Sequence, residues 1–183
     1  MKKILAIFVL VLFLVPGLTN AQFKMSIGPA VGFNWNFHSA GNATGNGIGL
    51  FLGGTCDMEF SKSLGLVGNL YVFDNKYGSY NGNGLGINYV TLEGLLKWNL
   101  NSSKFYFLSG LGFGFCTGSS PSGITNTNVR IEVKAGAGYN FEIGKMVLSP
   151  FITAGYGFTD VVSNSDWKIF TIQAGANLKF PII

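Results

Sequence analysis

The sequence predicts an all-β protein, a single eight-stranded antiparallel up-and-down transmembrane β-barrel. Three observations support this prediction. Eight segments alternate between polar and apolar residues, charged residues make up 11% of the chain against 48% hydrophobic residues, and no stretch after residue 21 reaches the about 18 apolar residues of a membrane helix. Because a soluble domain carries about 25% charged residues, this composition predicts contact with lipid through strands.

Residues 1–21 have the layout of a secretory signal peptide. A basic Met1-Lys2-Lys3 precedes an unbroken apolar run from Ile4 to Val15, and the small-residue sequence Thr19-Asn20-Ala21 offers a cleavage site. The alternative is a membrane anchor, but this run would form a helix of about 18 Å, shorter than the hydrocarbon layer of about 30 Å. We therefore expect a signal peptide over residues 1–21, a barrel over residues 22–183, and export to the outer membrane of a Gram-negative bacterium.

Eight segments after the signal peptide show the period of two that places successive side chains on opposite faces of a strand. The expected strands run from Lys24 to Phe37, Gly47 to Phe60, Leu64 to Asn75, Gly86 to Leu100, Lys104 to Thr117, Asn128 to Glu142, Met146 to Thr159 and Trp167 to Phe180. Tight connections are expected at Ser61 to Ser63, Asn101 to Ser103 and Ile143 to Lys145, and longer ones at His38 to Asn46, Lys76 to Leu85, Gly118 to Thr127 and Asp160 to Asp166. This alternation is typical of an outer-membrane barrel with both termini in the periplasm.

The distribution of charge predicts that the apolar face of each strand points outward. Of the ten basic and eight acidic residues after residue 21, eleven fall on the polar face and five in connections. Two, Asp74 and Lys168, fall on the apolar face near loop-side strand ends, where a charge facing lipid costs about 0 to 1 kcal/mol. The third segment is ambiguous, because Val67 and Tyr71 compete with Leu66 and Leu70 for the apolar face.

Aromatic residues on the apolar face gather at two heights, near the short turns and near the long loops. The belt residues are Trp35, Phe37, Trp98, Phe105, Phe107, Tyr139, Phe141, Tyr156, Phe158 and Phe180. Two aromatic belts around an aliphatic band are typical of a barrel that spans lipid. The alternative is a secreted soluble barrel that buries this face and binds a ligand, but its water-facing side would then consist largely of glycines and eleven charges.

Seven charged residues on the polar face form a candidate constellation in the barrel lumen. They are Asp57, Glu59, Glu93, Lys97, Arg130, Glu132 and Lys134. Eight strands leave an interior just wide enough for side chains, so we expect these charges to pair with one another as structural groups. Glu93 is expected to pair with either Arg130 or Lys134, and a proton or ion pathway is the alternative interpretation.

The sequence predicts no catalytic, cofactor-binding or metal site. His38, the single histidine, is followed by Ser39, but adjacent strand residues point in opposite directions and no supporting base or acid is evident. Cys56 and Cys116 are the only thiols. They are expected on opposite faces of the sheet and at different heights, so no disulfide is predicted.

The chain resembles the small outer-membrane barrels of the OmpA and OmpX type, and it is similar to the Bacteroidetes barrel families that include PorT-like proteins. The similar motifs are Gly110 to Phe115, Ala135 to Phe141 and Ala154 to Phe158. The chain departs from them at Pro29 and Pro150, where a β-bulge is expected, and at Pro181 to Ile183, which follow the aromatic Phe180.

The resemblance implies a non-enzymatic, porin-like protein of the cell envelope, with a structural or surface-interaction role. The alternative is a transport or secretion accessory that passes an ion or a small apolar solute. Expected partners are outer-membrane lipids, lipopolysaccharide and the outer-membrane assembly machinery, with the barrel itself a monomer. Nucleic acid is not expected, because the net charge of +4 falls to +2 without Lys2 and Lys3 and the remaining basic residues form no run.

Overall fold

The computed structural model describes residues 23–40, 43–80, 83–100, 104–120, 128–161 and 166–182. The predicted signal peptide therefore lies outside the described residues. Within the described part of the chain, no helix is long and apolar enough to cross a membrane.

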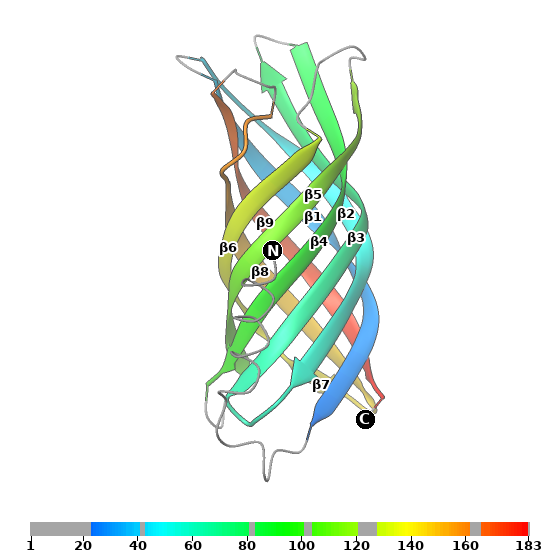
Figure 1. The fold of residues 1–183 in the computed structure, drawn as a ribbon. Helices are drawn as coiled ribbons and strands as arrows, with labels where there is room; N and C mark the ends of the chain where they lie inside the picture. Colours follow the sequence, from blue (N-terminus) through cyan, green and yellow to red (C-terminus); the bar gives the residue numbers. More distant parts are fainter. Residues whose placement is uncertain are drawn as a thin grey trace.

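The described residues form one tall cylinder of tilted antiparallel strands (Figure 1). The strands are β1 (Lys24–Ala40), β2 (Ala43–Glu59), β3 (Leu64–Tyr80), β4 (Asn83–Asn99), β5 (Phe105–Ser120), β6 (Val129–Tyr139), β7 (Phe141–Ile143), β8 (Met146–Gly157) and β9 (Trp167–Pro181). β6 and β7 are separated by Asn140 alone and both pair with β8, so together they form one strand of the barrel. Pairing of β1 with β9 completes the ring. The prediction of a closed eight-stranded antiparallel barrel is confirmed.

The two prolines inside strands interrupt hydrogen bonding without shifting the register, so the prediction of bulges there is wrong. Pro150 faces the break between β6 and β7, yet the pairs on both sides of the break, Gly138 with Phe151 and Phe141 with Leu148, keep one register. Pro29 lies in a similar gap in the β1–β9 ladder. A missing N–H removes one ladder bond, and the pairs on either side hold the alignment.

The structure has a β-bulge in β3 that the sequence pattern did not reveal. Gly53 pairs with Tyr71 and Leu52 with Phe73, so Val72 is an extra residue, and both Val72 and Phe73 face outward, 60% and 42% exposed. The bulge reverses the alternation beyond it. This explains the ambiguous third segment.

Two charge assignments must be corrected because of this bulge. Asp74 was expected on the apolar face, and Lys76 was expected in a connection. Both side chains are instead fully buried inside the barrel, because the residues of β3 beyond the bulge point inward at even numbers. Lys168 does lie on the outer side near a loop, as expected, and is partly exposed.

Two of the predicted long loops are largely strand. β1 and β2 remain paired up to Ala40 and Ala43, and β3 and β4 up to Tyr80 and Asn83. Residues rich in Gly, Asn and Ser were assigned to loops because they have low strand propensity. Pairing with a neighbouring strand overrides that propensity here, so the barrel wall extends toward the loop end.

The turn between β7 and β8 is a two-residue hairpin. Ile143 pairs with Met146, Gly144 has a φ of 61°, and Lys145 is not among the described residues with positive φ. A positive φ at the first central position alone defines a type II′ turn, which favours glycine there. This tight turn lies where the sequence predicts one.

The outer wall is apolar and the interior is polar. Outward side chains such as Ile48, Leu50 and Ile152 are more than half exposed, whereas inward side chains such as Asn34 and Gln173 are buried. Three apolar clusters of the described residues are the exceptions inside: Ala30 with Phe51, Tyr71 and Phe151; Val67 with Leu95, Tyr106 and Leu108; and, near the loop end, Leu85 with Ile87, Tyr89, Val161 and Ile169. A water-soluble domain buries its large apolar residues, so this wall is built for contact with an apolar medium.

The two cysteines are free thiols in the structure. Cys56 lies on the outer wall, and Cys116 packs on the inner side near the loop end against an apolar cluster. We expect the protein, purified without reductant, to have the mass of the dithiol and to react with two equivalents of a thiol reagent after denaturation. A mass lighter by two hydrogens under these conditions would contradict the placement of the cysteines on opposite faces.

Candidate functional site

The central part of the lumen holds a buried network of four charges from β4 and β6. Lys134 forms an ion pair with Glu93 and lies 3.2 Å from Glu132, and Arg130 lies 2.6 Å from the other carboxylate oxygen of Glu132. β5 separates the two strands and presents inward Gly110 and Gly112, so no side chain there blocks the approach of Lys134 to Glu93. Of the two partners expected for Glu93, the structure brings Lys134 to it.

Amides and hydroxyls from the opposite wall complete this central network. Asn69 donates a hydrogen bond to Glu93 over 2.9 Å, and Lys134 donates to the side-chain oxygen of Gln173 over 2.9 Å. Thr153 donates to the same Gln173 oxygen over 3.2 Å. The network therefore ties β3 to β4, β6, β8 and β9 across the barrel.

A second network closes the lumen near the short turns. Lys97 lies 2.7 Å from Asp57 and 2.8 Å from Glu59, and Lys179 lies 2.5 Å from Asp57. Both ammonium groups also face the ring of Tyr106, at 5.0 and 5.8 Å from its centroid, which is within the range of cation–π attraction. A hollow of about 580 Å³ opens at this end, and Asp57 and Lys179 are among the residues that line it.

A third network lies toward the loop end and contains the two charges that the bulge brings inside. Lys76 lies 3.0 Å from Asp74. Asn34 and Thr91 donate hydrogen bonds to the two oxygens of Asp74 over 2.6 and 2.7 Å. The alternating pattern does not place Asp74 and Lys76 in the lumen, because nothing in it fixes the position of the bulge.

All seven charges expected in the lumen point inward, and three further ones, Asp74, Lys76 and Lys179, join them. The ten form three networks with five carboxylates and five cations. Every one of these charges lies within 4 Å of an opposite charge, so the networks cross-link the wall. Each network has as many cations as carboxylates and therefore carries no net charge. Lys179 was placed on the polar face by its parity, but its role in the second network was not foreseen.

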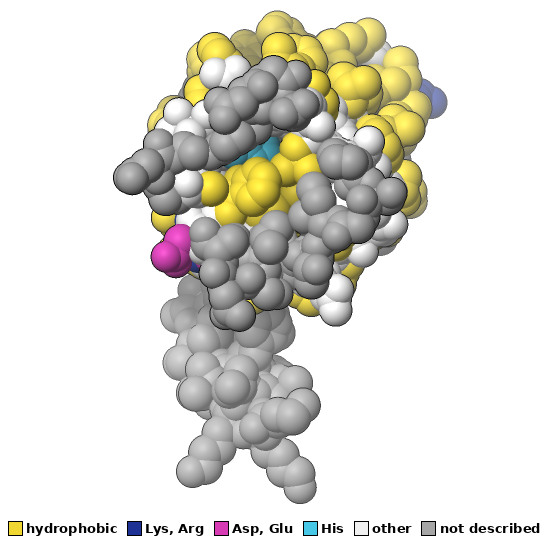
Figure 2. Space-filling view, turned by 90° about the horizontal axis from the view of Figure 1, so that it is seen from above, with side chains coloured by type: hydrophobic (Ala, Val, Ile, Leu, Met, Phe, Trp, Pro, Cys, Tyr) yellow, Lys and Arg dark blue, Asp and Glu magenta, His cyan; other side chains and the backbone are white. Residues whose placement is uncertain are grey.

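The mouth at the loop end is sealed by apolar side chains. Seen from above, hydrophobic atoms fill the centre of the opening and His38 lies beside them (Figure 2). The cluster consists of Leu85, Ile87, Tyr89, Val161 and Ile169, with Cys116 and Trp167 packed against it. The indole N–H of Trp167 donates to Nδ1 of His38 over 3.2 Å. The lumen thus ends in an apolar plug above the charged networks.

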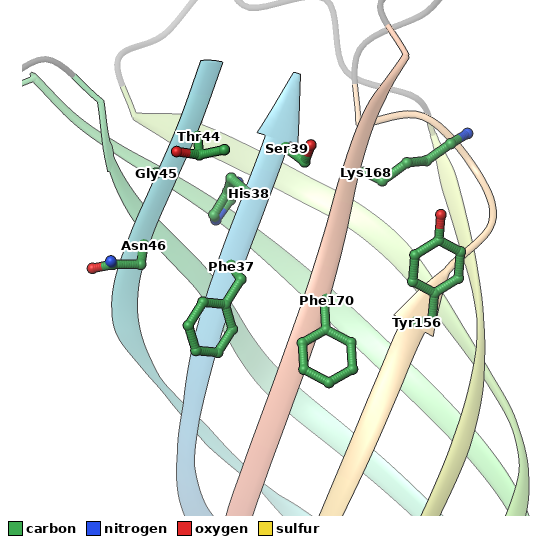
Figure 3. Close-up of a pocket in the computed structure, with 9 residues that line it drawn as sticks. All are labelled: Phe37, His38, Ser39, Thr44, Gly45, Asn46, Tyr156, Lys168 and Phe170. Carbon is green, nitrogen blue, oxygen red and sulfur yellow. The ribbon is translucent and has the colours of Figure 1, made fainter. Parts of the chain in front are cut away.

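His38 and Ser39 do not form a catalytic pair. His38 is buried inside the barrel, whereas Ser39 is exposed on the outer wall. Figure 3 shows the two side chains leaving β1 in different directions. Among the described residues, no group of three or more His, Cys, Asp or Glu side chains could hold a metal ion.

A hollow of about 430 Å³ lies on the outer side of the wall near the loops, and we call it the rim hollow. It is lined by Phe37, His38, Ser39, Thr44, Gly45, Asn46, Tyr156, Lys168 and Phe170. Figure 3 shows the rings of Phe37, Phe170 and Tyr156 below, with Ser39, Thr44 and Lys168 nearer the loops. The sequence predicts Phe37, Tyr156 and Phe170 on the apolar face near the long loops, whereas their grouping with the other lining residues depends on the register of four strands.

The predicted belt residues lie on the outer wall. Eight of the ten are prominently exposed, Trp35 and Phe105 among them, while Phe37 and Tyr139 are half-buried beneath neighbouring rings. Ring contacts link several of them along and across strands. The Trp35 and Phe37 centroids lie 5.2 Å apart, and those of Phe105 and Tyr139 lie 4.7 Å apart.

Comparisons with known proteins identify the fold and nothing finer. No family model matches the chain, and no curated protein matches it in sequence. Solved structures similar to this chain include those of Ail and OprG. Ail, the attachment invasion locus protein of Yersinia pestis, solved in complex with the heparin analogue sucrose octasulfate, has a TM-score of 0.53 at 14% identity over 86% of this chain and 99% of Ail. The outer membrane protein OprG from Pseudomonas aeruginosa has a TM-score of 0.55 at 12% identity over 88% of this chain and 96% of OprG.

The chain therefore has the fold of small outer-membrane barrels. Identities of this size show the fold alone, so the activities of Ail and OprG are not carried over. The resemblance to the OmpA, OmpX and PorT-like families stays an expectation, because no family model matches.

Proposed function

We propose that this chain is an integral outer-membrane barrel with a structural or surface-interaction role and no enzymatic activity. The observation that carries this proposal is the contrast between the outer and inner faces of the barrel wall. Large apolar side chains are exposed on the outside, aromatic residues lie near both ends, and ten charges are paired inside. In a lipid bilayer this arrangement places the apolar face of each strand against lipid and the polar face inside the barrel, so each face lies in a favourable environment. In water it would expose the apolar face, which argues against a soluble binding protein.

The paired interior favours a structural role over ion transport. An ion pathway needs mobile water and charges that are free to exchange partners, whereas these carboxylates and cations are buried and bound to one another. Separating such a pair costs several kcal/mol. The apolar cluster at the mouth offers a small apolar solute a surface to bind, so passage of such a solute is the second candidate.

Refolding residues 22–183 into detergent and then into bilayers tests the proposal. We expect a compact form that shifts its electrophoretic mobility on boiling, and no conductance steps above the background of protein-free membranes. A protein that stays soluble without detergent would contradict insertion. Reproducible conductance steps would contradict the closed interior and favour an ion pathway.

A further inference from the structure

The rim hollow has two layers set by strand pairing. Phe170 pairs with both Phe37 and Tyr156, which places three rings side by side across β1, β9 and β8. The next outward row toward the loops contains Lys168, Ser39 and Thr44, because Ser39 pairs with both of the others. The hollow therefore offers an apolar floor next to a row of hydroxyl and ammonium groups.

Lys168 is held in place at the edge of this row. Its ammonium group donates to the backbone carbonyl of Phe158 over 2.8 Å and forms an ion pair with Asp160. An ammonium group has three donors, so two are directed to these acceptors while the side chain keeps 30% of its surface exposed. Figure 3 also shows the Tyr156 hydroxyl pointing toward Lys168.

The charge of the hollow selects against a purely anionic ligand. Lys168 is the one cation among its lining residues, and Asp160 offsets it. A phosphate group would meet the carboxylate of Asp160 as well as the ammonium group. A ligand with hydroxyl groups can instead bond to Ser39, Thr44, Asn46 and Lys168 without a net charge, and the C–H face of a sugar ring packs well on aromatic rings.

The height of the hollow identifies where such a ligand comes from. Phe37 and Tyr156 belong to the aromatic belt near the loops, and belt residues lie at the level of lipid headgroups. We propose that the rim hollow binds the sugar headgroup of a glycolipid from the surrounding membrane leaflet, with the acyl chains continuing down the apolar wall. This inference rests on the proposed insertion into a membrane, and it adds a partner chemistry and a site to it.

Native mass spectrometry of the barrel released from detergent tests the site. The probes are a monoglucosyl diacylglycerol and a phosphatidylglycerol with the same acyl chains. We expect the wild-type barrel to retain one glucosyl lipid in preference to phosphatidylglycerol. The variant Ser39→Ala/Tyr156→Leu should retain at least about fivefold less of it, the effect of losing about one hydrogen bond, while its heat-modifiable band shift stays intact.

A matched variant away from the hollow controls for the loss of a tyrosine and a serine. Tyr139→Leu/Ser109→Ala changes two outward residues of β6 and β5, neither of which lines the hollow. It should retain the glucosyl lipid as the wild type does. Equal retention by both variants, or equal retention of phosphatidylglycerol, would overturn the site.

Two further results separate the sources of failure. Displacement of the lipid by millimolar maltose would show that a free saccharide is the ligand, which overturns the assignment to a lipid. A wild-type barrel that inserts and shows the band shift but retains no glucosyl lipid would overturn this inference alone. Failure to insert would overturn the proposed function and the inference together.

Discussion

Replacing Lys134 with methionine should lower the free energy of unfolding by about 3 to 5 kcal/mol, the usual cost of leaving a buried charge without its partner. Lys134 is fully buried, and in the described residues it is the cation that pairs with Glu93. After the substitution, Glu93 would keep the hydrogen bond from the amide of Asn69 but would have lost its cation. Methionine fills similar volume, so the effect reports mainly on charge.

A double-mutant cycle isolates this pair. Glu93→Gln combined with Lys134→Met should cost less than the sum of the two single substitutions by at least about 1 kcal/mol, because both unpaired charges are then gone. Denaturant unfolding in detergent of the wild type, the two single variants and the double variant provides the four free energies of the cycle. Strictly additive losses would show that the ion pair does not exist.

Lys179→Met combined with Glu93→Gln serves as the matched control. Lys179 is also a buried lysine, but it pairs with Asp57 in the network near the short turns. Sites in separate networks add within about 0.5 kcal/mol. A coupling as large as that between Glu93 and Lys134 would mean that the lumen charges act as one undivided cluster.

Placing arginine at Ile152 should reduce the stability of the inserted barrel by about 2 to 4 kcal/mol, the cost of arginine facing lipid near the midplane. Ile152 is outward and 54% exposed. It lies four residues from Tyr156 on one side and four from Leu148, the partner of belt residue Phe141, on the other. This position is midway between the two belts. The yield of folded barrel in bilayers and its unfolding midpoint measure the effect.

Ser79→Arg is the control, because Ser79 is also outward and exposed but lies near the loop end of β3. It should cost about 0 to 1 kcal/mol. An inward position such as Gln173 is unsuitable, since an arginine there would be buried beside Lys134. Equal damage at Ile152 and Ser79 would contradict the assignment of Ile152 to the lipid-facing band.

The fold could be predicted from the sequence because a strand with two different environments repeats every two residues. Residues 129–134 show this directly, since Val129, Ile131 and Val133 alternate with Arg130, Glu132 and Lys134. Arg130, Glu132 and Lys134 are all buried in the structure, as this alternation predicts. The inward direction of the lumen charges needed only the further argument that apolar residues face lipid.

The pairing of those charges could not be predicted to the same depth, because it depends on register and on bulges. Glu93 had two candidate partners that differ by four residues along one strand, and alternation gives both the same face. Asp74 and Lys76 were misplaced for a related reason, since an extra residue in β3 has no signature in a chain where Val72 and Phe73 are both apolar. The rim hollow depends on the same register.

The bulge in β3 also restricts how the length of that strand can change. Removing Val72 alone would leave Phe73 as the single outward residue between Tyr71 and Asp74, which removes the bulge and keeps Asp74 and Lys76 inside the barrel in the same register. Removing both Val72 and Phe73 would make Tyr71 and Asp74 neighbours, and residues 74–80 would then present Asp74 and Lys76 to the lipid. The stretch between Tyr71 and Asp74 therefore tolerates one residue or two but not none, and related chains that keep these two charges in the lumen should have one or two residues there.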